Sequence, residues 1–206
     1  MRARMALTQI DLTLEMREVS LKNRPPQLHD ISPKGTVPVL HLQNGEVIDE
    51  SLDIMLWCLQ QNEGQSDFSS QLDLIKIIDG DFKYWLDHYK YHERHPEYSR
   101  DYYREKCADI LSQFENLLEK NTYISGNEMQ LADMAIFPFV RQFAHVKKDW
   151  FLSAFQTLTE WYQQIHTSPV FTGVMEKYDF WKEGDDPLLI NFYEIGNTVK
   201  PILQKL

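Results

Sequence analysis

The chain has 206 residues and a formal net charge of −10, with 43% hydrophobic and 25% charged residues, a composition ordinary for globular proteins. It carries no basic block that could neutralise phosphates, which argues against nucleic acid as a direct ligand. No apolar run approaches the roughly 20 residues of a membrane span, and the start has no apolar signal core, so no membrane partner and a cytoplasmic location are expected. The length allows one or two domains.

The first part of the chain predicts a small α/β unit. Residues 2–9 predict a short helix, and residues 12–19 alternate apolar and charged positions, which indicates a half-buried strand. A loop over residues 21–26 follows, and a weak helical turn extends from there to about Asp30. The predicted order of elements up to about Asp30 is therefore helix, strand, loop and helix.

The first recognisable motif begins at a turn signal, Ser32-Pro33-Lys34-Gly35, which leads into a β-branched segment from Thr36 to Leu42. Pro38 interrupts the segment, so we expect a strand at a sheet edge or with a bend. If the Val37-Pro38 bond is cis, the bend turns the N–H and C=O of Val37 outward, where an extended peptide can pair with them. The generic frequency of cis bonds before proline is low, so the sequence leaves this open.

The same segment continues into a hairpin and a helix. Asn44-Gly45 predicts a two-residue turn between His41-Leu42 and Val47-Ile48. A helix predicted from Asp49-Glu50-Ser51 to Gln61 would present free N–H groups and the positive end of its dipole to a carboxylate. The segment therefore offers a strand edge for a peptide backbone and a helix N-terminus for an anion, which are the two features that a small acidic peptide needs.

A polar stretch at residues 62–70 predicts an interdomain linker. The sequence after it predicts mainly helices. Residues 184–206 contain Gly184, Pro187 and Pro201 and predict a tail packed on the surface. The apolar spacing predicts helices over residues 72–89, 103–117, 131–146 (apolar nearly all round) and 151–165 (ending before Ser168).

The run Lys34-Gly-Thr-Val-Pro-Val-Leu, followed by Val-Ile-Asp-Glu-Ser-Leu-Asp-Ile, resembles the glutathione-binding half of cytosolic glutathione transferases, especially the bacterial members related to the omega class. The resemblance implies a thioredoxin-like α/β domain at residues 1–62 that lacks its first strand, a linker at residues 63–70 and an all-α domain at residues 71–206. It also implies a homodimer, with glutathione as co-substrate and a small electrophile or disulfide as second substrate.

The resemblance assigns ligand contacts to five residues. The hydroxyl and N–H of Ser51 would hold the γ-glutamyl carboxylate, and Glu50 would face the γ-glutamyl amino group; the alternative for both is a plain helix cap. Val37, next to Pro38, would pair through its backbone with the cysteinyl residue. Arg24 falls at the second lysine of the omega-like pattern Leu-Lys-Asn-Lys-Pro and would pair with the glycyl carboxylate, unless it is a solvated loop charge.

No residue of the chain is predicted to be catalytic. The resemblance places the nucleophilic cysteine a few residues before Met1, at the N-terminus of the first helix, where the dipole lowers the pKa of a thiol. Cys58 and Cys107 lie in apolar helical contexts without metal-ligand spacing and are expected to be buried. Met1 is then either an internal methionine of a longer protein or the start of a shortened relative. The chain as given is expected to bind glutathione weakly without turnover.

Several other residues admit two interpretations. Lys34 is expected to be a solvated turn residue. His88 and His92, with His95 nearby, have the i, i+4 spacing that can bind zinc, but no third ligand is fixed, and a cleft wall or an exposed helix face is also possible. The sequence does not decide between cleft and core for Tyr84, Tyr91, Trp150 and Phe151.

A second family feature begins at Ser125 and reaches Asp133, where the buried helix of the C-terminal domain starts. Asp133 is predicted to be a folding residue rather than a catalytic one, with Met129 and Met134 as the hydrophobic pair around it. Gln130 takes the N-cap position, where glutamine is a poor cap.

The rival function is that of a non-catalytic regulator, as in the stringent-starvation proteins, which share this two-domain shape and bind RNA polymerase.

Overall fold

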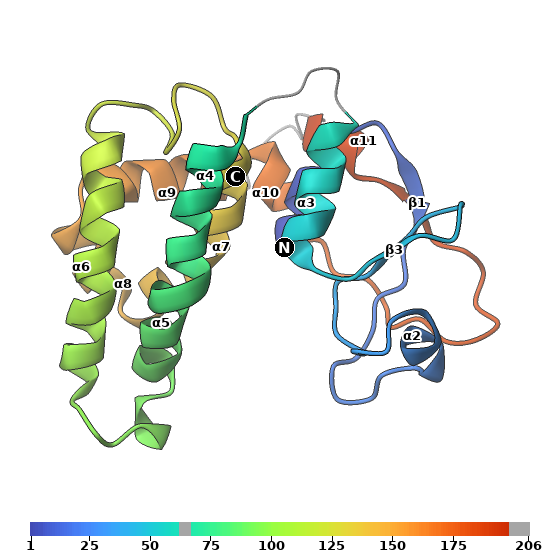
Figure 1. The fold of residues 1–206 in the computed structure, drawn as a ribbon, viewed down its shortest axis with the longest axis horizontal. Helices are drawn as coiled ribbons and strands as arrows, with labels where there is room; N and C mark the ends of the chain where they lie inside the picture. Colours follow the sequence, from blue (N-terminus) through green and yellow to red (C-terminus); the bar gives the residue numbers. More distant parts are fainter. Residues whose placement is uncertain (62–66, 198–206) are drawn as a thin grey trace, which may run out of the picture. The chain divides into compact units, whose positions relative to one another are not determined.

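The computed structural model of the protein describes residues 1–61 and 67–197. These residues form two compact units, one made of residues 1–61 and 167–197 and the other of residues 67–166 (Figure 1). Residues 63–66 of the predicted linker, and the predicted tail from residue 198 onwards, lie outside the described residues. No helix in the described ranges is long and apolar enough to cross a membrane.

The first unit is a small α/β structure whose elements come from both ends of the chain. Two antiparallel pairs, β1 with β4 and β2 with β3, form separate two-stranded sheets. Its helices are α1 (Arg2–Leu7), α2 (Pro26–Ile31), α3 (Ser51–Gln60), α10 (Pro169–Val174) and α11 (Phe192–Asn197). Its strands are β1 (Thr13–Glu15), β2 (Leu40–His41), β3 (Val47–Ile48) and β4 (Leu189–Asn191).

Both N-terminal strands are shorter than the sequence patterns predict. The strand predicted over residues 12–19 is limited to β1, although Met16 still donates its N–H to the carbonyl oxygen of Leu188 at 2.8 Å. The strand predicted over residues 36–42 is limited to β2, because Pro38 has no N–H with which to extend the ladder towards Thr36. Alternation of apolar and polar residues therefore identifies the extended segments, but it does not predict how many residues form hydrogen-bonded strand pairs.

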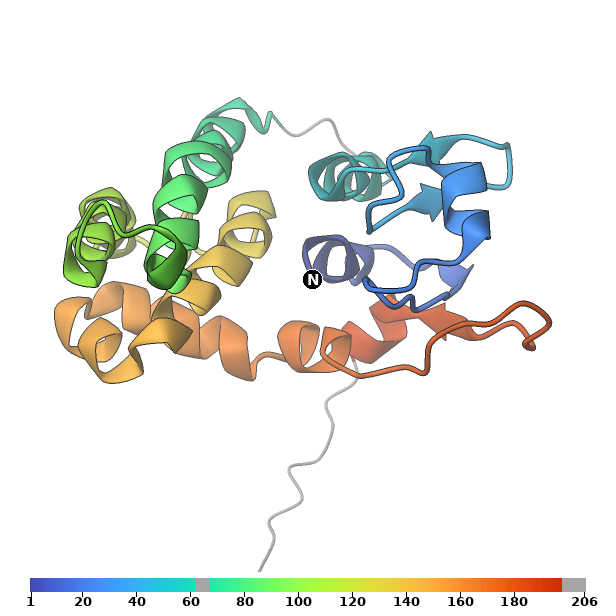
Figure 2. The ribbon, with the colours of Figure 1, turned by 90° about the horizontal axis from the view of Figure 1, so that it is seen from below.

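The core of the first unit lies where α1 packs beside α3 (Figure 2). Met5 and Ala6 on α1 and Met55 and Cys58 on α3 are completely buried. Helix α1 also contacts α10 and α11, which come from the C-terminal part of the chain. Helix α1 is therefore covered by α3 and by the two C-terminal helices.

The described part of the predicted surface tail, residues 184–197, is an integral part of this unit, which corrects the prediction for these residues. Strand β4 occupies an edge of β1, and Ile190 and Phe192 are 7% and 1% exposed. The physical reason is that β1 would otherwise leave its N–H and C=O groups unpaired along that edge. Residues 167–197 group with residues 1–61 in one compact unit, while the division into domains at residues 1–62 and 71–206 stays a prediction.

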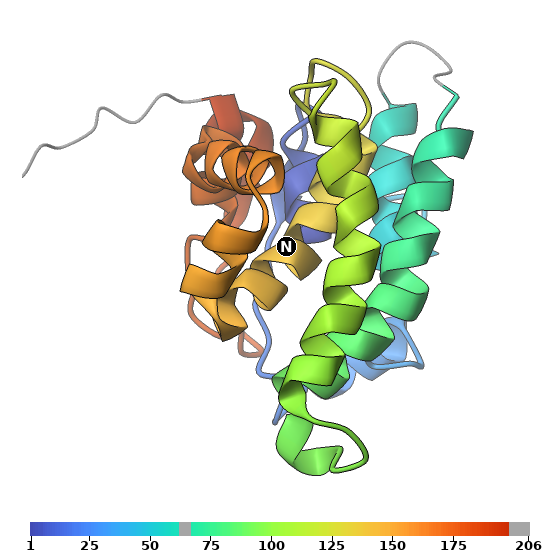
Figure 3. The same cartoon turned by 90° about the vertical axis from the view of Figure 1, so that its left-hand side faces the viewer.

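The second unit is all helical. Helices α4, η1 (a π-helical turn) and α5 follow one another without a break, so the long helix predicted over residues 72–89 is present with a π-helical turn inside it. Helix α6 runs along α5 (Figure 3). The elements are α4 (Ser69–Ile77), η1 (Ile78–Phe82), α5 (Lys83–Lys90), η2 (His92–Arg94), α6 (Arg100–Leu118), α7 (Leu131–Val146), α8 (Lys148–Ala154) and α9 (Thr157–Thr167).

The single helix predicted over residues 151–165 is in fact two, α8 and α9. Glu115 on α6 explains the break, because its carboxylate accepts the N–H groups of Gln156, Thr157 and Leu158 at 2.8, 3.0 and 2.7 Å. These are the N–H groups that a new helix leaves without partners in its first turn. A carboxylate from a distant helix thus acts as the cap of α9, which no local sequence signal indicates.

Helix α7 is buried nearly all round, as predicted, and its start is capped from a neighbouring helix. Gln71 on α4 accepts the N–H of Ala132 at 3.0 Å and donates to the side-chain oxygen of Gln130 at 2.7 Å. The prediction that Gln130 is a poor cap is therefore incomplete, because Gln71 satisfies an N–H in the first turn of α7.

Candidate functional site

Val37, predicted to lie on a strand edge, is in the irregular segment of the first unit that leads into β2. The Val37-Pro38 bond is cis, and the Val37 side chain is 42% exposed. Within the described part of the chain, neither the N–H nor the carbonyl oxygen of Val37 pairs with another backbone group. Both groups are therefore available to an extended peptide ligand that lies alongside the segment.

The hairpin that follows is confirmed, but its loop has three residues instead of two. Leu42 donates its N–H to the carbonyl of Glu46 at 2.8 Å, and Gly45 donates back to Leu42 at 3.0 Å, so the loop is residues 43–45. Gly45 has φ +87°, the left-handed conformation that closes this kind of loop. The register pairs Leu40 with Ile48, and this brings the start of α3 next to the strand that follows Pro38.

Helix α3 begins at Ser51, as predicted, and its first turn is open. Glu50 is the N-cap but makes no side-chain cap hydrogen bond. Among the described residues, nothing accepts the N–H groups of Ser51 and Leu52, and the Ser51 side chain is half-buried. A carboxylate placed there would satisfy these N–H groups and lie at the positive end of a 10-residue helix.

A network around Glu50 was missed by sequence reasoning. The Nζ of Lys34 donates to Oδ1 of Asp49 at 3.1 Å and to Oε1 of Glu50 at 2.9 Å, while Ser32 Oγ donates to Oδ2 of Asp49 at 2.9 Å. Hydrogen bonds to Glu50 and Asp49 raise the pKa of Lys34, and the bond from Lys34 lowers the pKa of Asp49. Lys34 is thus paired rather than merely solvated. The only sequence signal was a lysine before a predicted hairpin and two acids after it.

The turn that carries Lys34 depends on glycine at position 35. The N–H of Gly35 donates to the carbonyl of Ser32 at 2.9 Å, and its φ is +58°. A Cβ added there would meet the ring of His29, which lies at the end of an exposed side chain and can move aside. We therefore expect Gly35→Ala to lower the free energy of unfolding by about 1–2 kcal/mol, which is the cost of the left-handed backbone. Urea unfolding followed by circular dichroism measures this.

Gly45→Ala is the matched control for this prediction. Gly45 also has a positive φ, of +87°, but nothing lies within 4 Å of an added Cβ. Gly45→Ala should lower the free energy of unfolding by a similar amount, the cost of its own left-handed backbone. A clearly larger loss in Gly35→Ala would show that the His29 ring cannot move aside.

Arg24, the fifth predicted ligand residue, is not tied to the others. It is exposed in the loop between β1 and α2, and in the described part of the chain it forms no hydrogen bond or ion pair. Pro38 is half-buried beside Val37. The structure therefore brings the hairpin residues and the start of α3 together, whereas the role of Arg24 stays a prediction.

Neither thiol is placed to react. Cys58 and Cys107 are both completely buried on helices. Burial raises the pKa of Cys58 to about 12 and raises that of Cys107 as well. A thiol that stays protonated and out of reach of solvent is a poor nucleophile, so the predicted burial of both cysteines is confirmed.

The histidine segment of the second unit forms an aromatic cluster. The His88 and His95 rings lie 3.8 Å apart between centroids, and the Nδ1 of His88 is 2.8 Å from the carbonyl oxygen of Tyr84. Within the described ranges, no three His, Cys, Asp or Glu side chains lie close enough to share an ion. Of the four aromatic residues left open by the sequence, Phe151 is core, Trp150 is half-buried, and Tyr84 and Tyr91 are exposed.

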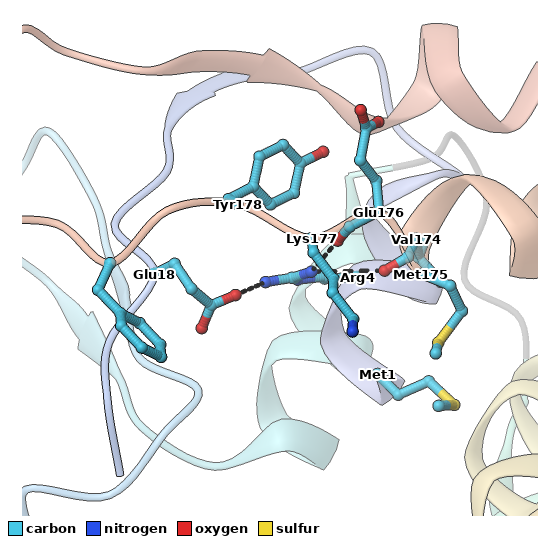
Figure 4. A pocket seen from close by; sticks show the side chains of 9 residues that line it. Met1, Arg4, Glu18, Val174, Met175, Glu176, Lys177 and Tyr178 are labelled. Carbon is cyan, nitrogen blue, oxygen red and sulfur yellow. Dashed lines mark hydrogen bonds and ion pairs between the residues drawn. The ribbon is translucent and has the colours of Figure 1, made fainter. Parts of the chain in front are cut away.

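A hollow of about 350 Å³ lies within the first unit, between α1 and the segment after α10 (Figure 4). Arg4 crosses it, donating to Oε2 of Glu18 at 2.6 Å and to the carbonyl oxygens of Val174 and Glu176 at 3.4 Å each. These contacts hold the C-terminal segment against α1, so Arg4 has a structural role. The lining residues are Met1, Arg4, Glu18, Val174, Met175, Glu176, Lys177, Tyr178 and Phe180, none of them a predicted ligand residue.

Comparison with known families and structures explains the arrangement. Residues 1–66 match the family model of the glutathione S-transferase N-terminal domain, and residues 80–176 match that of the C-terminal domain. A ternary complex of BphK, a bacterial enzyme of this family, is 19% identical, with 84% of this chain and 92% of that one covered and a TM-score of 0.68.

Two further structures show the same fold. The glutathione transferase URE2P6 from Phanerochaete chrysosporium, in complex with oxidised glutathione, is 17% identical, with 84% of this chain and 88% of that one covered and a TM-score of 0.71. A glutathione transferase from Burkholderia graminis, with two glutathione molecules bound per subunit, is 16% identical, with 83% and 80% covered and a TM-score of 0.68. The architecture is a thioredoxin-like α/β domain followed by a helical domain, and the chain belongs to the glutathione S-transferase family.

Proposed function

We propose that this protein binds glutathione and takes part in glutathione-dependent conjugation or thiol–disulfide exchange with a small electrophilic or disulfide substrate. The observation that carries the proposal is the open segment from Val37 to Ser51, where unpaired backbone groups and an uncapped helix N-terminus follow one another. Structures of similar fold contain glutathione, which supports the same ligand here. From the motif alone, we also propose the bacterial omega-related type.

Each part of the ligand finds a chemical complement in this proposal. The Ser51 hydroxyl and N–H hold the γ-glutamyl carboxylate, and Glu50 accepts from the γ-glutamyl amino group. Val37, beside Pro38, pairs with the cysteinyl backbone. Arg24 pairs with the glycyl carboxylate, to which its guanidinium can donate two parallel hydrogen bonds.

No catalytic residue is proposed among the described ones, because both thiols are buried with raised pKa values. We therefore expect the chain as given to bind glutathione with little turnover. A cytoplasmic homodimer is proposed from the family resemblance. The matching family models are those of transferases and give no support to a purely regulatory protein.

Replacing Ser51 with alanine tests the proposal. Because a hydrogen bond to a charged group contributes about 1.5–3 kcal/mol, Ser51→Ala should weaken glutathione binding roughly 10- to 100-fold. Isothermal titration calorimetry with reduced glutathione measures the dissociation constant.

Ser69→Ala is the matched control, because Ser69 is also the first residue of a helix but lies in the second unit. Its dissociation constant should equal that of the wild type. Wild-type protein that does not bind glutathione, or a Ser51→Ala variant that binds as tightly as the wild type, would contradict the proposal.

A further inference from the structure

Lys34 and Glu50 form an ion pair at the start of α3 that leaves part of the Glu50 carboxylate free. The Nζ of Lys34 lies 2.9 Å from Oε1 of Glu50, and among the described residues nothing donates to Oε2. The Glu50 side chain is 59% exposed, so a ligand can reach this second oxygen. The Glu50 carboxylate thus pairs with Lys34 through one oxygen and leaves the other oxygen open to a ligand.

Asp49 fixes the lysine in place. It receives a hydrogen bond from Lys34 at 3.1 Å through Oδ1 and one from Ser32 at 2.9 Å through Oδ2. The turn closed by the bond from Gly35 to Ser32 carries Lys34 towards these two acids. The lysine is therefore held at two carboxylates and by the turn on which it lies.

The charge balance of this group matters for a ligand with both an ammonium and a carboxylate. Asp49 and Glu50 together carry two negative charges next to the open N–H groups of Ser51 and Leu52, where a ligand carboxylate would bind. Without a cation between them, the two acids would repel that carboxylate and each other. Lys34 neutralises one of the two charges and leaves the other for the ammonium.

We propose that Lys34 is a positioning residue for the α-amino acid end of the ligand: it holds Glu50 through Oε1, so that Oε2 accepts from the ligand ammonium while the N–H groups at the adjacent helix N-terminus donate to the ligand carboxylate. This proposal rests on the proposed glutathione function. Lys34 does not contact the ligand itself but acts through Glu50. Loss of the lysine should therefore weaken binding without removing any direct ligand contact.

Lys34→Gln tests this role by calorimetry with two ligands, glutathione and glutathione acetylated on its α-amino group. Because an exposed ion pair contributes little, the variant should bind glutathione roughly 2- to 5-fold more weakly than the wild type. Acetylation removes the ammonium that donates to Glu50. Lys34→Gln should therefore reduce the affinity for the acetylated ligand less than the affinity for glutathione. Lys34→Arg keeps the cation and should restore most of the affinity for glutathione.

Two further variants separate positioning from other effects. In a Glu50→Gln background, adding Lys34→Gln should change the dissociation constant little, because the lysine acts through that carboxylate. Lys182→Gln removes an equal charge elsewhere in the same unit and should bind glutathione like the wild type. Equal losses for the two ligands in Lys34→Gln, or fully additive losses with Glu50→Gln, would overturn the proposal.

A measurement without ligand keeps this proposal separate from the proposed function. Carboxyl-carbon NMR titration should show a higher pKa of Asp49 in Lys34→Gln than in the wild type, since the bond from Lys34 lowers it. An unchanged pKa of Asp49 would overturn the network itself, even if glutathione binds. If the pKa of Asp49 rises but the wild type does not bind glutathione, the proposed function fails and the ligand role of Lys34 falls with it.

Discussion

Replacement of Asp133 with alanine is expected to be the most destabilising single change in the second unit. Asp133 is completely buried, and its carboxylate accepts hydrogen bonds from the N–H of Ile124 at 2.9 Å, the N–H of Gln130 at 3.0 Å and the indole N–H of Trp161 at 2.7 Å. Each buried donor that loses its partner costs about 1–3 kcal/mol, so Asp133→Ala should lower the free energy of unfolding by about 3–5 kcal/mol. Urea unfolding followed by tryptophan fluorescence measures the loss.

Two variants show whether the hydrogen bonds cause the effect. Trp161→Phe removes only one of the three donors and keeps an aromatic ring, although a smaller one, so it should cost less than Asp133→Ala. Asp109→Ala removes an exposed carboxylate from helix α6 and should stay within about 0.5 kcal/mol of the wild type. A loss below about 1 kcal/mol in Asp133→Ala would contradict the folding role assigned to this residue.

Phe192→Ala is expected to have a comparable effect on the first unit, although Phe192 lies near the other end of the chain. The Phe192 side chain is 1% exposed, and α11 packs against α1 and α10. Truncation of a buried phenylalanine to alanine costs about 3–5 kcal/mol, through the lost apolar burial and the cavity that remains. Hydrogen exchange should show the loss as faster exchange in α1 and β1, because their cover comes from this segment.

Phe180→Ala is the matched control, since Phe180 belongs to the same C-terminal segment but is 59% exposed. It should change the free energy of unfolding by about 0.5 kcal/mol or less. If Phe192→Ala accelerated exchange only in β4 and α11, the C-terminal segment would be a surface tail after all, as the sequence predicts.

The sequence predicts the local elements of the site well, because their signals are local. Asn44-Gly45 marks the hairpin, and Asp49-Glu50-Ser51 marks the start of α3, both within a few residues of the structure they cause. The isomer of the Val37-Pro38 bond could not be predicted from residue chemistry alone, since proline permits both.

What the sequence could not predict depends on contacts between distant residues. Lys34 reaches Glu50 only after the hairpin has folded, and Glu115 caps α9 from a different helix. The pairing of β1 with β4 joins residues about 175 positions apart. Gly184 and Pro187 make the sequence of this segment typical of a loop, so the short strand is not predicted. Propensity and periodicity describe a segment but not its partner.

The central claim is that glutathione binds along the segment from Val37 to Ser51. The most direct measurement is a titration of isotope-labelled protein with glutathione, followed through backbone amide NMR signals. We expect saturable shifts concentrated at Val37, Glu50, Ser51 and Leu52, with the residues around Asp133 unchanged. Shifts that are absent, or that fall outside this segment, would contradict the account.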